Sequence, residues 1–301
     1  MQLTIENTKV PKGIVDVVLD TDTYNEVDDQ FALAYMLKSK ERFNVKAIYA
    51  APFFNQNSTS PKDGMEKSYD EIHKILQLVQ QKVEVFKGAE NYLVDKNMPV
   101  ISPASKDLAK RALKYSPEKP LYVVAIGAIT NVASAIILEP KIVNNIVLVW
   151  LGGHAHHYTH TQEFNMKQDM IGAKIVMTCG APFIQLPCRG VVDAFTISRV
   201  EFEYYFKGKT ELSDYLATHA IEQISAQRNK KDWSKIIWDV CAVAYLLNDD
   251  DRFMLSRIIP AKIPSTEKYY IEPSQAPFIR YVYSIKRDEI LSDLVEKLTK
   301  K

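Results

Sequence analysis

Short apolar runs alternate with longer segments of helical periodicity over the first two thirds of the chain. The apolar runs are rich in β-branched residues and cover 14–19, 45–50, 83–86, 121–126, 145–151 and 182–187. Helical patterns lie between or after them at 30–39, 64–79, 106–115, 130–138 and 170–178. Nearly continuous apolar strands that alternate with helices are typical of parallel strands covered on both faces. We therefore expect an α/β fold with a doubly wound, mostly parallel sheet and helices on both faces.

The last third of the chain has a different pattern. From about residue 198 onward it is mostly helical, and one apolar run at 277–285 predicts a further strand. A length of 301 residues suits one large domain or two ordinary ones. No internal repeat, low-complexity tract or long linker divides the chain, so we expect one domain over 1–301 with a helical C-terminal third.

Composition and charge narrow the class of protein. Hydrophobic residues make up 47% and charged residues 25%, as in soluble globular proteins. The net charge is +1 without a basic block, which argues against nucleic-acid or acidic-membrane partners. No run has membrane-spanning length, and the polar N-terminus lacks the apolar core of a signal peptide. Three cysteines without a CxxC pair favour a reducing compartment, so we expect a cytoplasmic protein.

The stretch "DTDTYNEVDD" (20–29) directly follows the first apolar run and concentrates negative charge. Five of its ten residues are acidic. One interpretation is that Asp28 caps the following helix while the other acids are solvated and favoured by the helix dipole. The alternative is a bound divalent cation that offsets the repulsion. Carboxylate oxygens without nearby Cys or His favour Ca²⁺ or Mg²⁺.

A DxD after the first strand also occurs in haloacid-dehalogenase-like phosphatases. Those proteins place Thr or Val where this chain has Tyr24, and they lack the pair Asp28–Asp29 at the helix start. The stretch "DTDTYNEVDDQFAL" instead resembles the DxDPGxDD segment of inosine-uridine-preferring nucleoside hydrolases. The acids match, whereas the Pro-Gly is missing and the connection is two residues longer.

Three further stretches carry the same resemblance, and each also has a plain structural interpretation. "VVAIGAITNVASA" (123–135) is similar to the family's GPLTNxA segment, or is an ordinary turn with a helix capped by Thr130 or Asn131. "QEFNMKQD" (162–169) retains the family's EFN core, or is a capping set for the next helix. "IIWDVCAVAYLL" (236–247) matches the Asp of the family's HDPxA, or contains only a helix cap.

The resemblance implies an N-glycosidase that hydrolyses ribonucleosides with the help of Ca²⁺. The implied calcium ligands are Asp22, Asp29, Asp239 and the backbone carbonyl of Ile126. Asp22 would also accept a proton from the attacking water as general base. The family forms dimers and tetramers, so a homo-oligomer is expected.

The resemblance also implies the substrate contacts. Asp28 and Asn165 would bind ribose hydroxyls, and Glu163 would bind the 5′ end. Asn55 is a candidate for a further ribose-side contact. Asp169 is expected to be structural.

Two departures from the family concern the leaving base. The family's His before the metal-binding Asp is Trp238 here, which we expect to line the base pocket or to pack in the core. The segment "HAHHYTH" (154–160) carries four histidines and replaces a Gly-Asn turn. His157 is the positional match for a leaving-group acid or a 5′-side contact. A histidine metal site or a solvated loop are the alternatives. The changed base-recognition elements also leave open a non-catalytic ribosyl-binding relative or, less favoured, a metal-dependent phosphatase.

Overall fold

The computed structural model describes residues 2–227, 232–265 and 267–300. Its central sheet has eight strands. These are β1 (Val15–Thr21), β2 (Phe43–Ala50), β3 (Glu84–Lys87), β4 (Leu121–Ala125), β5 (Ile146–Leu151), β6 (Phe183–Leu186), β9 (Met254–Pro260) and β12 (Phe278–Ile285). The sequence predicted seven of these strands to within about two residues at either end and missed β9.

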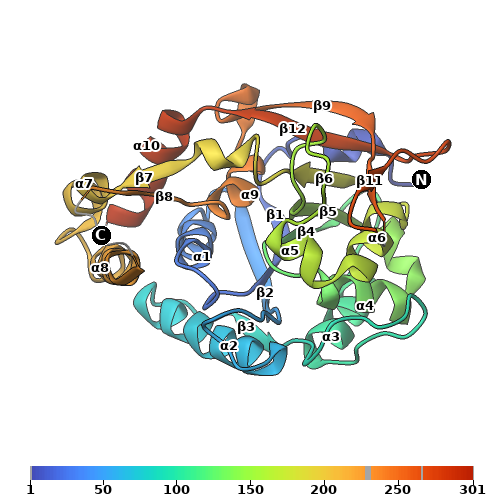
Figure 1. Cartoon of the computed structure of the whole chain (residues 1–301), viewed down its shortest axis with the longest axis horizontal. Helices are drawn as coiled ribbons and strands as arrows, with labels where there is room; N and C mark the ends of the chain where they lie inside the picture. Colours follow the sequence, from blue (N-terminus) through green and yellow to red (C-terminus); the bar gives the residue numbers. More distant parts are fainter. Residues whose placement is uncertain (1, 228–231, 266, 301) are drawn as a thin grey trace.

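The strand order makes the sheet doubly wound. The strands lie in the order β3-β2-β1-β4-β5-β6-β12-β9, and all neighbours pair in parallel except β12 and β9, which are antiparallel. The order reverses direction between β1 and β4 (Figure 1). In such sheets ligands bind outside the carboxyl ends of the strands at this reversal. The predicted fold class is confirmed.

Helices cover both faces of the sheet. They are α1 (Asp28–Lys38), α2 (Pro61–Leu78), α3 (Pro103–Ala112), α4 (Thr130–Leu138), α5 (Phe164–Gln168), α6 (Met170–Thr178), α7 (Arg199–Glu201), α8 (Glu211–Gln227), α9 (Val240–Tyr245) and α10 (Arg287–Thr299). Alternate strand residues feed two cores: Val17 and Leu19 of β1 join one, and Val18 between them joins the other. In Figure 1, α1 and α9 lie on one side of the strands and α3, α4 and α6 on the other.

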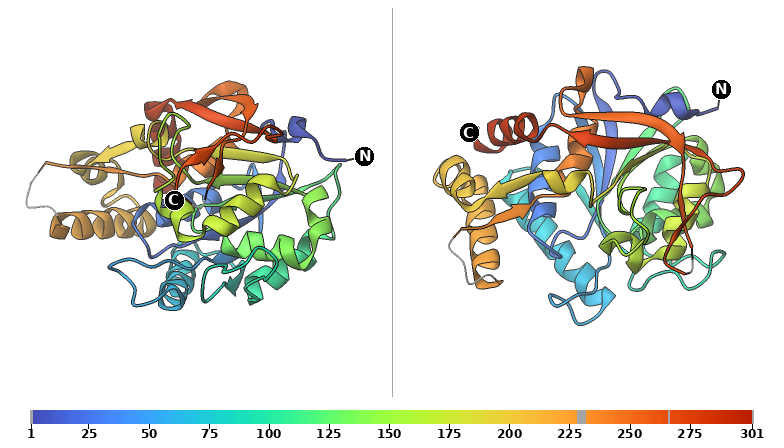
Figure 2. Two further views of the ribbon diagram at one scale, coloured as in Figure 1. Left: turned by 45° about the vertical axis from the view of Figure 1, so that its right-hand side comes forward. Right: turned by 45° about the horizontal axis from the view of Figure 1, so that its top comes forward.

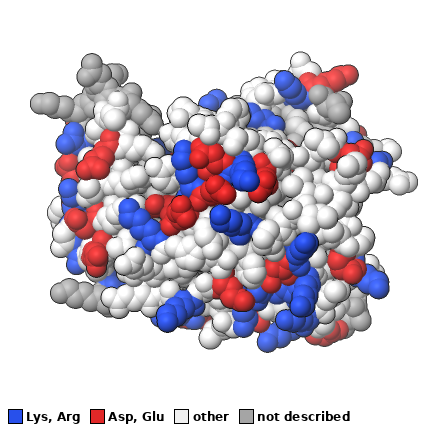
Figure 3. Space-filling view, turned by 90° about the horizontal axis from the view of Figure 1, so that it is seen from below, with Lys and Arg blue, Asp and Glu red and all other residues white. Residues whose placement is uncertain are grey.

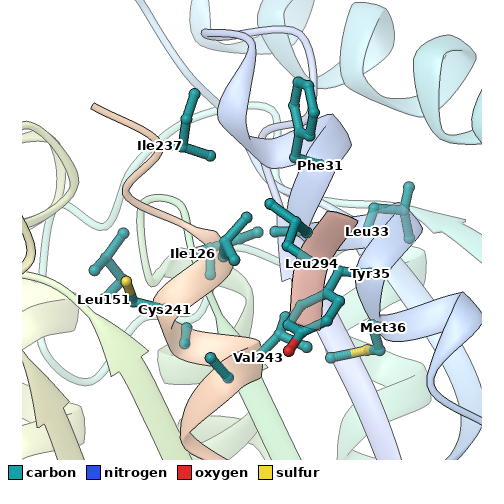
Figure 4. Packing of buried hydrophobic residues seen from close by; sticks show 14 of the residues in the cluster. Phe31, Leu33, Tyr35, Met36, Ile126, Leu151, Ile237, Cys241, Val243 and Leu294 are labelled. Carbon is teal, nitrogen blue, oxygen red and sulfur yellow. The ribbon is translucent and has the colours of Figure 1, made fainter. Parts of the chain in front are cut away.

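The core beside α1 fixes the start of that helix, which carries two acids of the opening loop. Phe31, Tyr35 and Met36 of α1 are fully buried. Figure 4 shows Tyr35 beside Val243 of α9, in the cluster that Leu294 of α10 also joins. Phe31 packs against Phe202 and Phe206 in the same cluster. Because close-packed interiors resist displacement, the α1 N-terminus is held rigidly against the sheet.

The last third contains more strand than the sequence predicted. The run at 277–285 forms β12 as expected, but β7 (Thr196–Ser198), β8 (Ser234–Ile236), β10 (Ile263–Pro264) and β11 (Tyr270–Ile271) accompany β9. The sequence did not predict β9, which is an edge strand with half-exposed and exposed residues. Such a strand lacks the continuous apolar run that marks a buried one. Figure 2 shows the β7–β8 pair and α8 projecting to one side of the central sheet.

Short helices complete the connections. In the described part of the chain, 3-10 helices cover Ile5–Thr8, Pro140–Asn144, Val192–Ala194 and Asp249–Asp251, and a π-helix covers Phe202–Phe206. On the face drawn in Figure 3, acidic and basic side chains are interspersed, which matches the near-zero net charge. Within the described ranges, no helix combines the length and apolar character needed to cross a bilayer.

Candidate functional site

A cavity opens where the strand order reverses, at the carboxyl ends of the central strands. It has a volume of about 420 Å³. Its walls come from three places: the segment after β4, the segment after β5 and the residues just before α9. Its lining consists of Asn25, Glu26, Asp28, Ile126, Leu151, His154, His160, Gln162, Glu163, Phe164, Asn165, Lys167, Cys188, Arg189, Trp238 and Asp239.

A cluster of buried carboxylates lies at this cavity. Ligand oxygens of Asp28, Asp29 and Asp239 all lie within 4.8 Å of one another, and the three residues are at most 4% exposed. Asp22 is fully buried beside them, and neither of its carboxylate oxygens accepts a hydrogen bond from any described residue. Buried acceptors without donors are costly, so this arrangement favours a cation among these oxygens.

Burial and mutual repulsion raise the pKa values of the whole cluster. Burial, followed by the charge of Asp28, raises the pKa of Asp29 to about 7. Burial and the charge of Asp29 raise the pKa of Asp22 well above its usual range. For Asp239, burial and the charge of the neighbouring Asp28 raise the pKa well above its usual range. The pKa of Asp28 also rises through burial, although the nearby Lys235 opposes the shift.

Neighbouring groups hold the acidic loop in place without neutralising the cluster. The Thr21 hydroxyl donates to Asp29 Oδ1 at 2.6 Å, and Asn131 Nδ2 donates to Asp20 Oδ1 at 2.8 Å. Lys235 forms an ion pair with Glu26. Gly127 approaches Asp22 so closely that a Cβ atom there would lie 2.8 Å from Asp22 Oδ1. These contacts fix the positions of the acids, whereas their charges stay largely unpaired.

The EFN segment lines the same cavity and is held in a rigid form. The Glu163 carboxylate accepts hydrogen bonds from the backbone N–H groups of Gly153, Asn165 and Met166 at 2.8–2.9 Å. Asn165 Nδ2 donates to the carbonyls of Ile126 at 2.9 Å and Leu151 at 3.0 Å. Both hydrogens of that amide are therefore used, and Asn165 Oδ1 is the atom left for a ligand.

Helix capping accounts for the two acids of the EFN segment but not for Asp28 or Asp239. Glu163 caps α5, because its carboxylate accepts from the N–H groups of Asn165 and Met166. Asp169 caps α6, because its Oδ1 accepts from the Gly172 N–H at 2.7 Å. The cap residue of α1 is Val27 rather than Asp28. Asp239 occupies the cap position of α9 but makes no capping hydrogen bond. Helix capping therefore does not explain why the carboxylates of Asp28 and Asp239 are buried at this site.

The other capping expectation concerned α4. Neither Thr130 nor Asn131 caps it: Thr130 donates to Asp169 Oδ2, and Asn131 binds Asp20. Both side chains instead tie the start of α4 to neighbouring acids.

The cavity lining includes six of the ten predicted site residues and omits four: Asp22 and Asp29, which are buried beside the lining acids, and Asn55 and His157. Asp28, Ile126, Glu163, Asn165, Trp238 and Asp239 line it. Neither Asn55 nor His157 belongs to the lining: Asn55 Nδ2 donates to Asn25 Oδ1 at 2.6 Å, and the His157 ring lies against Tyr158. Two of the clustered histidines, His154 and His160, line the cavity, and so does Arg189, which the sequence did not single out. The density of histidines at 154–160 signalled this wall without identifying the residue that faces inward.

The comparisons with known proteins agree with this geometry. Residues 17–274 match the family model described as inosine-uridine preferring nucleoside hydrolase. No curated protein sequence matches the chain. Solved structures match it over nearly their whole length.

A plant nucleoside hydrolase shares 18% identity, with 95% of this chain and 99% of that chain covered and a TM-score of 0.76. An inosine-guanosine nucleoside hydrolase shares 15% identity over 94% and 98%, with a TM-score of 0.75. A purine-preferring ribonucleoside hydrolase from Gardnerella vaginalis shares 20% identity over 94% and 98%, with a TM-score of 0.71. These likenesses show the fold, while the family model covers most of the sequence. The chain therefore belongs to the inosine-uridine preferring nucleoside hydrolase family and is an N-glycosidase.

Proposed function

We propose that this protein hydrolyses the N-glycosidic bond of ribonucleosides in a reaction that depends on Ca²⁺. The observation that carries the proposal is the group of four buried aspartates at the cavity, in which both carboxylate oxygens of Asp22 and Oδ1 of Asp28 meet no donor among the described residues. Those side chains offer only oxygen atoms, which suit a hard divalent cation. We further propose that the protein is a cytoplasmic homo-oligomer that acts in nucleoside salvage.

The residues present fit a calcium ion. Asp22, Asp29 and Asp239 would hold it, together with the carbonyl of Ile126, which accepts one hydrogen bond from Asn165 and retains a second lone pair. When bound, the ion supplies positive charge that lowers the pKa of a water molecule and orients ribose hydroxyls. Asp28 lies within the same set of oxygens, so it can contact both the ion and a ribose hydroxyl.

The remaining chemistry comes from the side chains themselves. Asp22 would accept the proton of the attacking water as general base. Asp28 and Asn165 Oδ1 would bind ribose hydroxyls, and Glu163 would bind the 5′ end. The negative cluster faces the sugar carbon, which gains positive charge as the bond to the base breaks, and so stabilises the transition state more than the substrate. Trp238 would contact the base.

A nucleoside panel tests the activity directly. We expect equimolar free base and ribose from at least one of adenosine, inosine, guanosine, uridine and cytidine. The release should stop in chelator and return with Ca²⁺. Base and reducing sugar are measured separately, and p-nitrophenyl phosphate is tested beside them. Absence of base release from the calcium-loaded protein would favour the non-catalytic relative. Release of p-nitrophenol, with no nucleoside cleaved, would favour the phosphatase.

The general base is tested with Asp22→Asn. Turnover should fall by about 10²-fold or more, the usual scale for loss of a positioned proton acceptor. Because Asp22 is also a proposed ligand, calcium occupancy is measured on the same sample by equilibrium dialysis. Glu26→Gln is the matched control: Glu26 belongs to the same loop but pairs with Lys235, so calcium binding should persist. A fully loaded Asp22→Asn protein with normal turnover would exclude this role for Asp22.

The base pocket is tested at Trp238, which lines the cavity and also packs against the core beside α1. An indole can stack on a base but has no useful acid at neutral pH. Trp238→Phe and Trp238→His should change the ranking of nucleosides by kcat/KM while the melting temperature changes little. Trp233→Phe is the control, since Trp233 is buried against Phe202 outside the cavity. Loss of stability with an unchanged ranking would show that Trp238 is only structural.

A further inference from the structure

The acidic and basic residues that line the cavity come mostly from different segments of the chain. Asp28 and Asp239 belong to the acidic loop and the start of α9. The basic lining residues are Lys167 of α5 and Arg189, which follows β6. The one acid on their side is Glu163, whose carboxylate already accepts three backbone hydrogen bonds. This division suits a ligand whose anionic group lies apart from the groups that meet the aspartates.

Both basic side chains are available to a ligand. Lys167 and Arg189 are exposed, and neither forms an ion pair with a residue in the described ranges. Lys235, by contrast, pairs with Glu26 and is not part of the lining. The Lys167 ammonium lies 5.3 Å from the centre of the Phe164 ring, which lines the same cavity, and a cation and a ring attract at that distance. Two cations without partners at one cavity favour an anionic ligand.

The turn that carries Arg189 is packed against the histidine-rich segment after β5. The Ala155 N–H donates to the Arg189 carbonyl at 2.9 Å. The next residue, Gly190, has a φ of +86°, and a Cβ atom there would lie 2.9 Å from both Ala155 Cβ and His157 Cε1. Asp193 Oδ2 accepts from the Gly190 N–H at 3.0 Å and so helps to close the turn. The Arg189 side chain therefore extends from a fixed backbone.

His160, from the same segment, adds a neutral hydrogen-bond donor to this side of the cavity. Its Nδ1 accepts from the Gln162 N–H at 3.2 Å, so the neutral ring carries its proton on Nε2. The His160 ring centre lies 5.2 Å from that of His154. Burial, followed by the charges of His160 and Arg189, lowers the pKa of His154 to about 4. Arg189 and His160 therefore both lie near His154, on one side of the cavity.

The neighbours of these groups indicate which part of a substrate they meet. Lys167 lies one turn after Glu163, because its N–H donates to the Glu163 carbonyl at 2.8 Å. The thiol of Cys188, the residue before Arg189, lies beside the Glu163 carboxylate. In the proposed function, Glu163 binds the 5′ end of the ribosyl group, while the aspartates bind the ion and other ribose hydroxyls. The basic residues therefore flank the 5′ end.

We propose that Lys167, Arg189 and His160 bind a 5′-phosphate, so that the protein cleaves ribonucleoside 5′-monophosphates in preference to the unphosphorylated nucleosides. This inference rests on the proposed function and names a substrate class for the same site. Water adds to C1′, the bond from C1′ to the base breaks, and the base leaves with a proton. The phosphate ester is untouched, so the second product is ribose 5-phosphate. A phosphate carries about two negative charges at pH 7, which two cations and a neutral donor match.

The test compares a nucleoside 5′-monophosphate with the nucleoside of the same base, both with calcium-loaded protein. The ratio of the two kcat/KM values, nucleotide over nucleoside, measures recognition of the phosphate and should exceed one in the wild type. Arg189→Gln and Lys167→Gln should each lower it by about tenfold to a hundredfold, the scale of a hydrogen bond between charged groups. The loss should come mainly from a higher KM for the nucleotide. His160→Phe should lower the ratio by several-fold.

Two further variants separate specific contacts from general charge effects. Lys167→Arg keeps the charge and should retain most of the ratio. Lys174→Gln is the matched control: Lys174 is an exposed lysine of α6 outside the lining, so the same loss of charge should leave the ratio unchanged. Melting temperatures confirm that each variant is folded. A wild-type ratio below one, or an unchanged ratio in both folded Gln variants, would overturn the proposal.

The products are identified as well as counted. Direct cleavage yields free base and ribose 5-phosphate without inorganic phosphate. Release of ribose together with inorganic phosphate would show that the phosphate is lost first, and it would overturn the proposal.

Binding of the product gives a readout that does not require turnover. Ribose 5-phosphate should raise the melting temperature of the calcium-loaded protein at lower concentrations than ribose, and Arg189→Gln should remove most of that difference. Equal protection by inorganic phosphate alone would indicate a site for free anions and overturn the assignment to a 5′-phosphate. If neither nucleoside nor nucleotide is cleaved, the proposed function fails, and this comparison alone decides phosphate binding. Cleavage of the nucleoside with a ratio below one would overturn this inference alone.

Discussion

Mutual repulsion among buried carboxylates is the constraint that the rest of the site depends on. At the separation of at most 4.8 Å between ligand oxygens of Asp28, Asp29 and Asp239, two ionised groups repel by about 3 kcal/mol at an effective dielectric constant near 20. Three such pairs approach about 10 kcal/mol, which is comparable to the whole stability of a typical domain. The cluster can persist only if protons or a cation occupy it. A cation satisfies this need and also serves the chemistry of N-glycosidic cleavage.

The fold supplies the positions that make this cluster possible. The acids follow β1, where the strand order reverses, and Asp239 joins them from the start of α9, which packs against α1. Asn131 and Thr21 hold neighbouring acids by hydrogen bonds, and Gly127 leaves room beside Asp22. In the same cavity, the backbone N–H groups of Gly153, Asn165 and Met166 hold Glu163, which we propose for the sugar's 5′ end. Rigid supports on both sides favour a preorganised site.

The sequence predicted the elements whose signal is local and missed those that depend on distant packing. Apolar runs such as 145–151 identify buried strands, and the acids at 20–29 identify the cluster, because each signal lies within a few residues. The half-exposed edge strand β9 lacks such a signal. Which of the clustered histidines line the cavity, His154 and His160 rather than His157, depends on tertiary packing that the local sequence pattern does not encode. The pairing of Asp239 with the opening acids followed only from the family resemblance.

Isothermal titration calorimetry with Ca²⁺ tests the central claim that a cation replaces protons in this cluster. Burial raises the pKa values of these carboxyls, to about 7 for Asp29, so the metal-free cluster holds protons at pH 6–7. Calcium binding should then release about one proton or more, seen as a dependence of the heat on buffer ionisation enthalpy, and the release should shrink as the pH rises. Asp239→Asn should weaken binding sharply. Absence of calcium binding, or binding at pH 6–7 without proton release, would contradict the account.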